Sequence, residues 1–192
     1  MSARRDLLYQ SEIHALVADA YRALDTADGA GTAFYSDEQL AALPTGTRRW
    51  ALGVGNPVRW AGLREDEVVV DLGCGAGIDA LLAAAAVRPG GRVVGVDVLA
   101  EMVARGAAFA AEASIDNVAW CRAEMEALPL ADASADVVIS NGAINLSPRK
   151  SRVLAEAHRV LRPGGRLCVS DLTVREEDLP TEILTHPSAW AG

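Results

Sequence analysis

The stretch VVVDLGCGAG, residues 68–77, decides the fold of this chain. An apolar, β-branched run that ends in an acid and passes into closely spaced glycines predicts a buried parallel strand and a tight turn that opens a helix. The glycines let a ligand approach the backbone closely, because they carry no Cβ. A dinucleotide fingerprint, G-x-G-x-x-G, would place its third glycine at position 78, but that position is Ile78 and the glycine comes one residue early, at Gly77. Asp71, just before the turn, favours a cationic or amine-bearing ligand over a pyrophosphate.

Composition indicates a globular protein with one sizeable core. The chain has 192 residues, of which 51% are hydrophobic and 23% are charged. Its net charge of -8 argues against nucleic acid and against an anionic membrane surface as partners. The alanine-rich run at 80–86 is too short to span a bilayer, and the first residues lack a secretory signal. Three cysteines without a C-x-x-C pair are typical of a reducing compartment, so we expect a cytoplasmic protein.

From Glu67 onward the pattern alternates between strands and helices. We predict strands at 67–71, 92–97, 117–122, 135–140 and 165–171, helices at 77–87, 100–113 and 149–161, and Pro-Gly-Gly turns at 89–91 and 163–165. This alternation predicts an α/β fold with a parallel sheet, right-handed crossovers and helices on both faces. Residues 63–192 are therefore expected to form one Rossmann-like domain.

Residues 1–62 are expected to form a helical cap or lid. Apolar residues at helical spacing predict an amphipathic helix over about 6–24, and 25–32 is typical of a loop. Ser36 or Asp37 would cap a short helix ending near Pro44. Asn56 and Pro57 would cap and begin another.

An acid ends the second predicted strand and is the first candidate ligand-binding side chain. Asp97 lies 97 − 77 = 20 residues past Gly77, the spacing at which nucleotide-binding α/β folds bind a ribose diol. The alternative is that Asp97 only caps the helix that follows it. Glu124 follows the third strand, where it could accept from an adenine amino group while the Met125 backbone N–H donates to a ring nitrogen. The alternative for Glu124 is a solvent-facing loop acid.

Further candidates lie around the same predicted edge of the sheet. Val98 and Met102 could form apolar walls for an adenine, or could be ordinary core. Asn141 ends the fourth strand, and ligands of open α/β sheets bind at the carboxyl ends of strands. Asn145 could line the same cavity, and for both asparagines the alternative is a loop side chain bonded to local backbone. The three histidines are scattered, and no His, Cys and Asp residues have metal-ligand spacing, so we expect no metal.

The turn at 71–77 resembles motif I of the Rossmann-like methyltransferases that use S-adenosylmethionine. Most of the chain from about Phe34 onward is similar to the arsenite methyltransferase family, in the stretches FYSDEQLAALP, LGVGNPVRWAGL, VVVDLGCGAGIDALLAA, GRVVGVDVLAEMVARG, AEMEALPL, DVVISNGAINLSP, HRVLRPGGRLCVSDL and the closing SAW-AG. The resemblance implies strand order 3-2-1-4-5, S-adenosylmethionine as cofactor and a small-molecule methyl acceptor. The cofactor-binding residues that it implies are Asp71, Gly73, Gly75, Gly77, Asp97, Glu124, Met125 and Asn141.

The cysteines depart from the pattern of that family. The resemblance implies thiolate ligands for trivalent arsenic in the Gly-Asn-Pro loop and after the fourth strand, but this chain has Val54 and Gly142 there. Cys74 lies in the glycine turn, and Cys121 and Cys168 are expected about 19 Å apart, four strands away from each other. Thiolates at that distance cannot share one arsenic atom, so we expect a different small acceptor.

The chain is also shorter than the family pattern. Methyltransferases of this fold add two strands after the fifth, but 192 − 171 = 21 residues follow Asp171 here, and they predict one short helix. The fifth strand would then be an apolar edge, which a truncated product would expose or a homodimer would cover.

Three functional hypotheses follow from these features. The preferred one is a methyltransferase that acts on a small molecule without an evident catalytic base. If the acceptor needs deprotonation, Tyr9, Tyr21 or His14 of the first helix could assist. The second hypothesis is a non-catalytic or truncated S-adenosylmethionine-binding protein. The third, a nicotinamide-dependent oxidoreductase, is disfavoured by Ile78 and Gly77.

Overall fold

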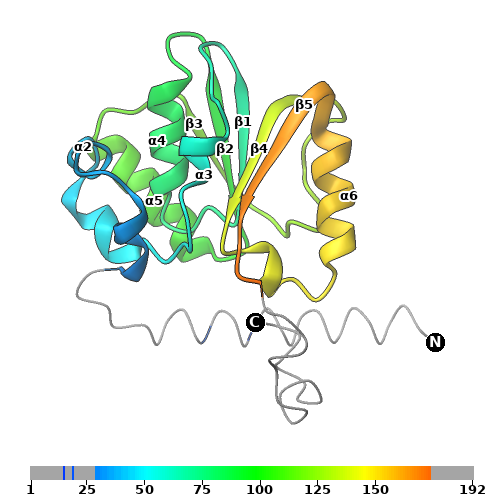
Figure 1. Cartoon of the computed structure of the whole chain (residues 1–192), viewed down its shortest axis with the longest axis horizontal. Helices are drawn as coiled ribbons and strands as arrows, with labels where there is room; N and C mark the ends of the chain where they lie inside the picture. The colour runs from blue at the N-terminus through cyan, green and yellow to red at the C-terminus, as the bar shows by residue number, and fades with distance from the viewer. Residues whose placement is uncertain (1–14, 16–18, 20–28, 174–192) are drawn as a thin grey trace.

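The computed structural model describes residues 29–173 and, before them, Ala15 and Asp19, both of which are helical. Its centre is a five-stranded parallel sheet with the order β3-β2-β1-β4-β5, as predicted (Figure 1). The strands are β1 (Val68–Leu72), β2 (Arg92–Asp97), β3 (Val118–Arg122), β4 (Ala135–Asn141) and β5 (Leu161–Ser170). The order reverses between β1 and β4, and such a switch point opens a crevice at the carboxyl ends of the strands.

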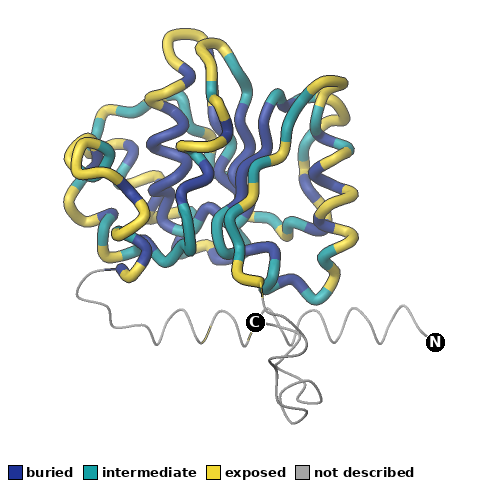
Figure 2. The backbone as a smooth tube through the Cα atoms, viewed as in Figure 1, coloured by how far each residue is buried: buried dark blue, intermediate teal, exposed yellow. Residues whose placement is uncertain are grey.

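Helices cover both faces of the sheet. The longer ones are α4 (Ile78–Ala86), α5 (Ala100–Glu112) and α6 (Lys150–Val160), close to the predicted bounds. Figure 1 shows α6 on the opposite side of the sheet from α4 and α5. The central strands β1 and β4 are mostly buried, as two covered faces require, whereas the edge strands β3 and β5 are half-buried or exposed (Figure 2).

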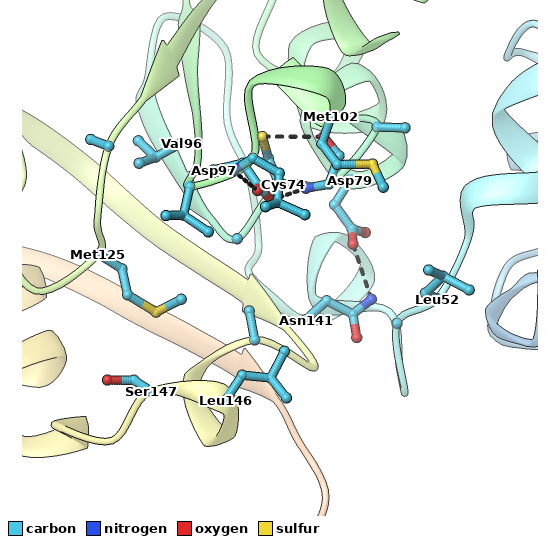
Figure 3. A pocket seen from close by; sticks show the side chains of 18 of the residues that line it. Leu52, Cys74, Asp79, Val96, Asp97, Met102, Met125, Asn141, Leu146 and Ser147 are labelled. Atoms are coloured by element: carbon cyan, nitrogen blue, oxygen red, sulfur yellow. Dashed lines mark hydrogen bonds between the residues drawn. The ribbon is translucent and has the colours of Figure 1, made fainter. Parts of the chain in front are cut away.

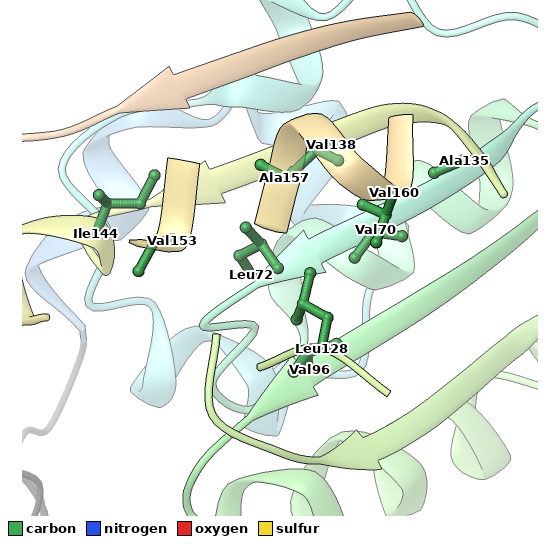
Figure 4. Packing of buried hydrophobic residues seen from close by; sticks show 10 residues of the cluster. All are labelled: Val70, Leu72, Val96, Leu128, Ala135, Val138, Ile144, Val153, Ala157 and Val160. Atoms are coloured by element: carbon green, nitrogen blue, oxygen red, sulfur yellow. The ribbon is translucent and has the colours of Figure 1, made fainter. Parts of the chain in front are cut away.

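Each face of the sheet packs its own hydrophobic core. Beneath α6, side chains of β1 and β4 meet one side of that helix (Figure 4), with the members Val70, Leu72, Val96, Leu128, Ala135, Val138, Ile144, Val153, Ala157 and Val160. On the other face, Val69, Val93 and Val137 pack against the small side chains of α4. Alternate residues of β1 therefore serve opposite cores, which explains why its sequence is an unbroken apolar run.

The segment before the sheet consists of short helical pieces. They are η1 (Ala30–Phe34), α2 (Asp37–Ala41), η2 (Thr45–Trp50) and α3 (Pro57–Trp60). Ser36 caps α2 in a reciprocal capping box with Gln39, and Asn56 caps α3 with Pro57 at its first position, as predicted. The two 3₁₀ helices were not predicted, and η1 overlaps the loop expected over 25–32. The predicted helix at 6–24 lies outside the described residues apart from Ala15 and Asp19.

One predicted boundary is wrong. Pro163, Gly164 and Gly165 were expected to form a turn before the fifth strand, but β5 already begins at Leu161 and includes them. Ala135 pairs with Leu161 and Val137 pairs with Arg166. An advance of two residues along β4 is therefore matched by an advance of five residues along β5. The Pro-Gly-Gly residues absorb this irregularity, and Gly164 does so with φ of +81°.

The described residues contain no strand after β5, which pairs only with β4 among them. Leu167 and Val169 of β5 are 39% and 40% exposed. No helix in the described part of the chain is both long and apolar enough to cross a membrane.

Candidate functional site

A cleft opens at the carboxyl ends of β1, β2, β3 and β4 (Figure 3). It encloses about 970 Å³ of empty space, including its open mouth. Eight of the ten predicted cofactor residues line it: Gly73, Gly75, Asp97, Val98, Met102, Glu124, Met125 and Asn141. The structure thus brings together residues that are spread over about 70 positions of the sequence.

The glycine turn takes backbone conformations that other residues rarely adopt. Gly73, Gly75 and Gly77 have φ of +71°, +52° and +93°. The N–H groups of Gly73 and Cys74 donate to the Val96 carbonyl, which ties the turn to β2. A Cβ on Gly75 would meet nothing within 4 Å, so this position faces the open cleft.

Gly77 lies apart from the other two glycines of the turn. It does not line the cleft, and it stands at the N-cap of α4. A Cβ there would collide with the ring of Trp120, which also packs against Gly95 and Gly106. Gly77 therefore serves the packing of α4 against Trp120. Gly73 and Gly75 both line the cleft, but a Cβ on Gly73 would collide with Ala143, so only Gly75 has open space beside it.

Asp97 accepts hydrogen bonds from two backbone N–H groups and also lines the cleft. Its Oδ1 accepts from the Leu99 N–H at 2.9 Å, where α5 begins, and its Oδ2 accepts from the Gly75 N–H at 2.9 Å. The carboxylate also lines the cleft (Figure 3). Burial raises its pKa, although the backbone hydrogen bonds oppose that shift. Each oxygen keeps a lone pair that could accept from a ligand hydroxyl.

Asp71 lies beneath the cleft. It does not line the cleft, and its side chain is 1% exposed. Its Oδ2 has no hydrogen-bond partner among the described residues. Burial raises the pKa of this carboxyl well above its usual range, and the nearby charges of Asp79 and Asp97 raise it further.

The walls of the cleft are mostly apolar. Met102 is buried on α5, while Val98 and Met125 are half-buried and Glu124 is exposed on the loop after β3. Asn145 does not line the cleft: its amide donates to the Asp171 carboxylate and to the Leu172 carbonyl, which follow β5 and are 26 and 27 residues away in the sequence.

Asn141 lines the cleft and also holds the loop at 52–56. Its Oδ1 accepts from the N–H groups of Val54 at 2.8 Å and Gly55 at 3.1 Å. Its Nδ2 donates to Asp79 Oδ2 at 3.0 Å, and Tyr35 donates its hydroxyl to Asp79 Oδ1 at 2.9 Å. Burial raises the pKa of Asp79 to about 6, although the hydrogen bonds from Asn141 and Tyr35 lower it.

Several residues of the cleft were not predicted. Asp79 reads in the sequence as an ordinary acid in the first turn of a helix. Glu126 and Ser147 form a buried hydrogen bond, in which the serine hydroxyl donates to the glutamate carboxylate. Both residues line the cleft, as Asp97 does. Trp50 lies at the rim, with the guanidinium of Arg105 4.1 Å from its ring centre. No group of three or more His, Cys, Asp or Glu residues in the described ranges could hold a metal ion.

The sheet order, the glycine turn and the acid at the end of β2 define a Rossmann-like nucleotide-binding domain. Residues 63–191 match the family model described as "Methyltransferase domain". The chain belongs to this family, the class I S-adenosylmethionine-dependent methyltransferases.

Individual relatives agree with this assignment. The chain is 40% identical over 166 residues to an arsenite methyltransferase of Halobacterium salinarum, covering 86% of this chain and 42% of the relative. It is 44% identical over 113 residues to the ubiquinone/menaquinone biosynthesis C-methyltransferase of Rubrivivax gelatinosus, covering 58% and 42%. An arsenic(III) S-adenosylmethionine methyltransferase structure from Chlamydomonas reinhardtii superposes with a TM-score of 0.70 at 40% identity, covering 78% and 52%. The chain spans about half the length of these relatives, or less.

Proposed function

We propose that this chain binds S-adenosylmethionine in the cleft and transfers its methyl group to a small-molecule acceptor. The observation that carries the proposal is the convergence of Gly73, Gly75, Asp97, Glu124 and Asn141 on one cleft at the switch point of the sheet. Family membership supports the same cofactor.

The residues present fit the two ends of this cofactor. Asp97 would accept from the ribose hydroxyls, with Val98 and Met102 beside the adenine and Glu124 and Met125 at its polar edge. Gly73 and Gly75 would let the methionine part approach the backbone. Asp71 lies beneath the cleft with an unpartnered Oδ2, so we assign it a supporting place under the glycine turn and no contact with the ligand.

S-adenosylmethionine supplies a methyl group that is already activated on a sulfonium. The protein's contribution is therefore to hold the donor and the acceptor in line, and orientation of that kind can lower a barrier by roughly 7–11 kcal/mol. The apolar walls formed by Leu52, Leu146 and Met125 would exclude water from the reacting atoms. We assign no catalytic base, and Tyr9, Tyr21 and His14 lie outside the described residues.

We propose further that the acceptor site does not present thiolates to arsenite. A Cβ on Gly142 would lie 3.7 Å from both γ-carbons of Val54, so the two positions where the resemblance implies cysteines are neighbours. Cys121 and Cys168 lie on the two opposite edge strands of the sheet, and Cys74 is buried in the turn. We therefore propose an acceptor other than arsenite, such as a carbon or heteroatom of a small organic molecule.

Arsenite turnover with excess thiol tests the choice of acceptor. We expect no methylated arsenic from the parent chain, and gain of arsenite binding by the double variant Val54→Cys, Gly142→Cys. Rapid arsenite methylation by the parent chain would contradict this part of the proposal.

Calorimetric titration with S-adenosylmethionine tests the cofactor site. We expect micromolar binding by the parent chain and at least tenfold weaker binding by Asp97→Ala, since two charge-assisted hydrogen bonds would be lost. Asp132→Ala is the matched control, because this exposed acid lies away from the cleft. Absence of binding by the parent would reject the proposal, while binding without turnover on any acceptor would favour the non-catalytic alternative.

We also propose that residues 1–62 act as a cap on the domain formed by 63–192. Trp50, Leu52 and Gly53 of this segment line the cleft, and Tyr35, Leu43 and Ala51 pack against α4 and α5. Hydrogen exchange of the backbone amides, measured with and without S-adenosylmethionine, tests the cap. We expect the amides at 50–56 to exchange more slowly when the cofactor is bound.

We propose a homodimer as the cover for the edge of β5, which pairs with no strand other than β4 among the described residues. The exposed Leu167 and Val169 support it, because an apolar edge strand invites pairing. Sedimentation velocity tests the oligomeric state of the chain in solution. A single monomeric species at high protein concentration would rule out the dimer.

A further inference from the structure

Three side chains from distant segments meet behind the loop at 52–56. They are Tyr35, which follows η1, Asp79 in the first turn of α4 and Asn141 at the end of β4. Asp79 accepts from both of the others, at 2.9 Å from the tyrosine hydroxyl and 3.0 Å from the asparagine amide. Asn141 Nδ2 also lies 3.1 Å from the tyrosine oxygen, which closes a triangle. Asp79 is 5% exposed and Tyr35 is 7% exposed, so little water competes for these bonds.

The carboxylate favours one of the two orientations of the Asn141 amide. An ionised carboxylate only accepts hydrogen bonds, so it can receive Nδ2 of the amide but not Oδ1. With Nδ2 held by Asp79, Oδ1 is directed at the N–H groups of Val54 and Gly55, and both donate to it. The reversed amide would instead place its two hydrogens against those two N–H groups.

The loop that Asn141 holds forms part of the cleft wall. Leu52 and Gly53 line the cleft, and Nδ2 of Asn141 donates to the Gly55 carbonyl at 2.8 Å. The amide of Asn141 lies directly against the Gly53 Cα, where a Cβ would collide with it. A reversal of the amide therefore removes the support of a wall of the ligand site.

We propose that Asp79 is a positioning residue, which orients the Asn141 amide and so fixes the loop at 52–56 against the ligand cleft. Asp79 itself does not need to touch ligand. The part of this inference that concerns ligand affinity rests on the proposed function, whereas the part that concerns the loop does not.

Protonation of Asp79 should weaken the arrangement. Burial raises the pKa of Asp79 to about 6, and the groups that face it are Asn141, Tyr35 and the buried Asp71. A proton on one oxygen turns that oxygen into a donor, which competes with Tyr35 or Asn141 for the remaining acceptor. We therefore expect protection of the loop amides to fall as the pH drops through about 6.

Hydrogen exchange of the Val54 and Gly55 amides, followed by NMR without ligand, tests the proposal. Asp79→Leu keeps the branched shape of the side chain but cannot accept a hydrogen bond. We expect the protection factors of both amides to fall about tenfold or more, because their shared acceptor loses its orientation. Asp79→Asn retains one acceptor oxygen that can face Asn141. It should keep protection within about threefold of the parent, without the pH dependence near 6. Tyr35→Phe leaves the Asp79–Asn141 bond in place and should have a smaller effect than Asp79→Leu.

Glu156→Gln is the matched control for loss of stability. Glu156 is also a buried acid at 5% exposure, but it bonds Leu128 and Arg159. It should lower the melting temperature without a selective change at Val54 and Gly55.

Two results would overturn the proposal. The first is native protection of the two amides in a folded Asp79→Leu variant. The second is an unchanged pH dependence in Asp79→Asn, a test that remains valid if Asp79→Leu does not fold. Failure of the parent chain to bind S-adenosylmethionine would reject the proposed function but would leave these exchange results to be judged separately.

Discussion

Replacement of Gly53 by alanine should destabilise the protein through one side chain, the amide of Asn141. A Cβ at position 53 would lie 2.6 Å from Oδ1 of Asn141 and closer still to its Cγ and Nδ2. The amide must then move, and three of its hydrogen bonds are at risk: those from Val54, from Gly55 and to Asp79. At about 1 kcal/mol for each bond, the loss is roughly 3 kcal/mol. The lower entropy of an alanine in the unfolded chain offsets about 0.4–1 kcal/mol of it.

Urea unfolding, followed by circular dichroism, measures this loss, and a double-mutant cycle identifies its cause. Gly53→Ala alone should cost about 2–3 kcal/mol. In an Asn141→Ala background the amide is absent, so the same change at Gly53 should cost less than about 0.5 kcal/mol. An equal cost in both backgrounds would refute the reasoning, because the clash would then not be with Asn141.

Three further predictions concern the core, the pH dependence of stability and a helix cap. Leu72→Ala should lower the free energy of unfolding in urea by about 2–5 kcal/mol, because the Leu72 side chain is fully buried between the sheet and α6. A loss below about 1 kcal/mol would contradict the packing. Because Asp79 has a pKa of about 6 in the folded state against 3.8 normally, its contribution to the free energy of global unfolding is most favourable below pH 4 and is lost as the pH rises through about 6, which is opposite in sign to the local loosening of the loop at 52–56 expected on protonation. Asp79→Asn should therefore gain up to about 3 kcal/mol relative to the parent between pH 4 and 7, and equal pH profiles from urea titrations would count against it. Ser36→Ala removes the cap of α2 and should cost about 1 kcal/mol by the same assay, whereas no loss would mean that the capping box contributes nothing in solution.

The sheet could be predicted from the sequence because its signals are local. The unbroken apolar run of β1 and the helical spacing in α5 and α6 place those elements within a residue or two. The strand order came from the resemblance to methyltransferases. The start of β5 was missed because Pro163 and two glycines normally signal a turn, whereas here β4 holds them in an irregular pairing.

The candidate site could be predicted only where a motif carries it. Gly73, Gly75 and Asp97 follow from fixed spacing along the chain, and the structure places all three at the cleft. Asp79 carries no such signal, since its partners Tyr35 and Asn141 lie 44 and 62 residues away in the sequence. The sequence does not distinguish Gly77 and Asp71 from the cleft-lining residues of the same motif. Only the packing in the structure shows that Gly77 faces Trp120 and that Asp71 lies beneath the cleft.

The junction between β1 and β4 has a consequence for how the protein folds. Val69 pairs with Val137 across 137 − 69 = 68 residues, while the pairs within β1–β3 and within β4–β5 join segments much closer in sequence. Closing the longest loop has the largest entropic cost, so we expect the two parts of the sheet to form before they join. The cleft takes Gly75 and Asp97 from one part and Asn141 and Ser147 from the other. Ligand-binding competence should therefore appear after most of the secondary structure during refolding, which makes a bound ligand a reporter of the last step.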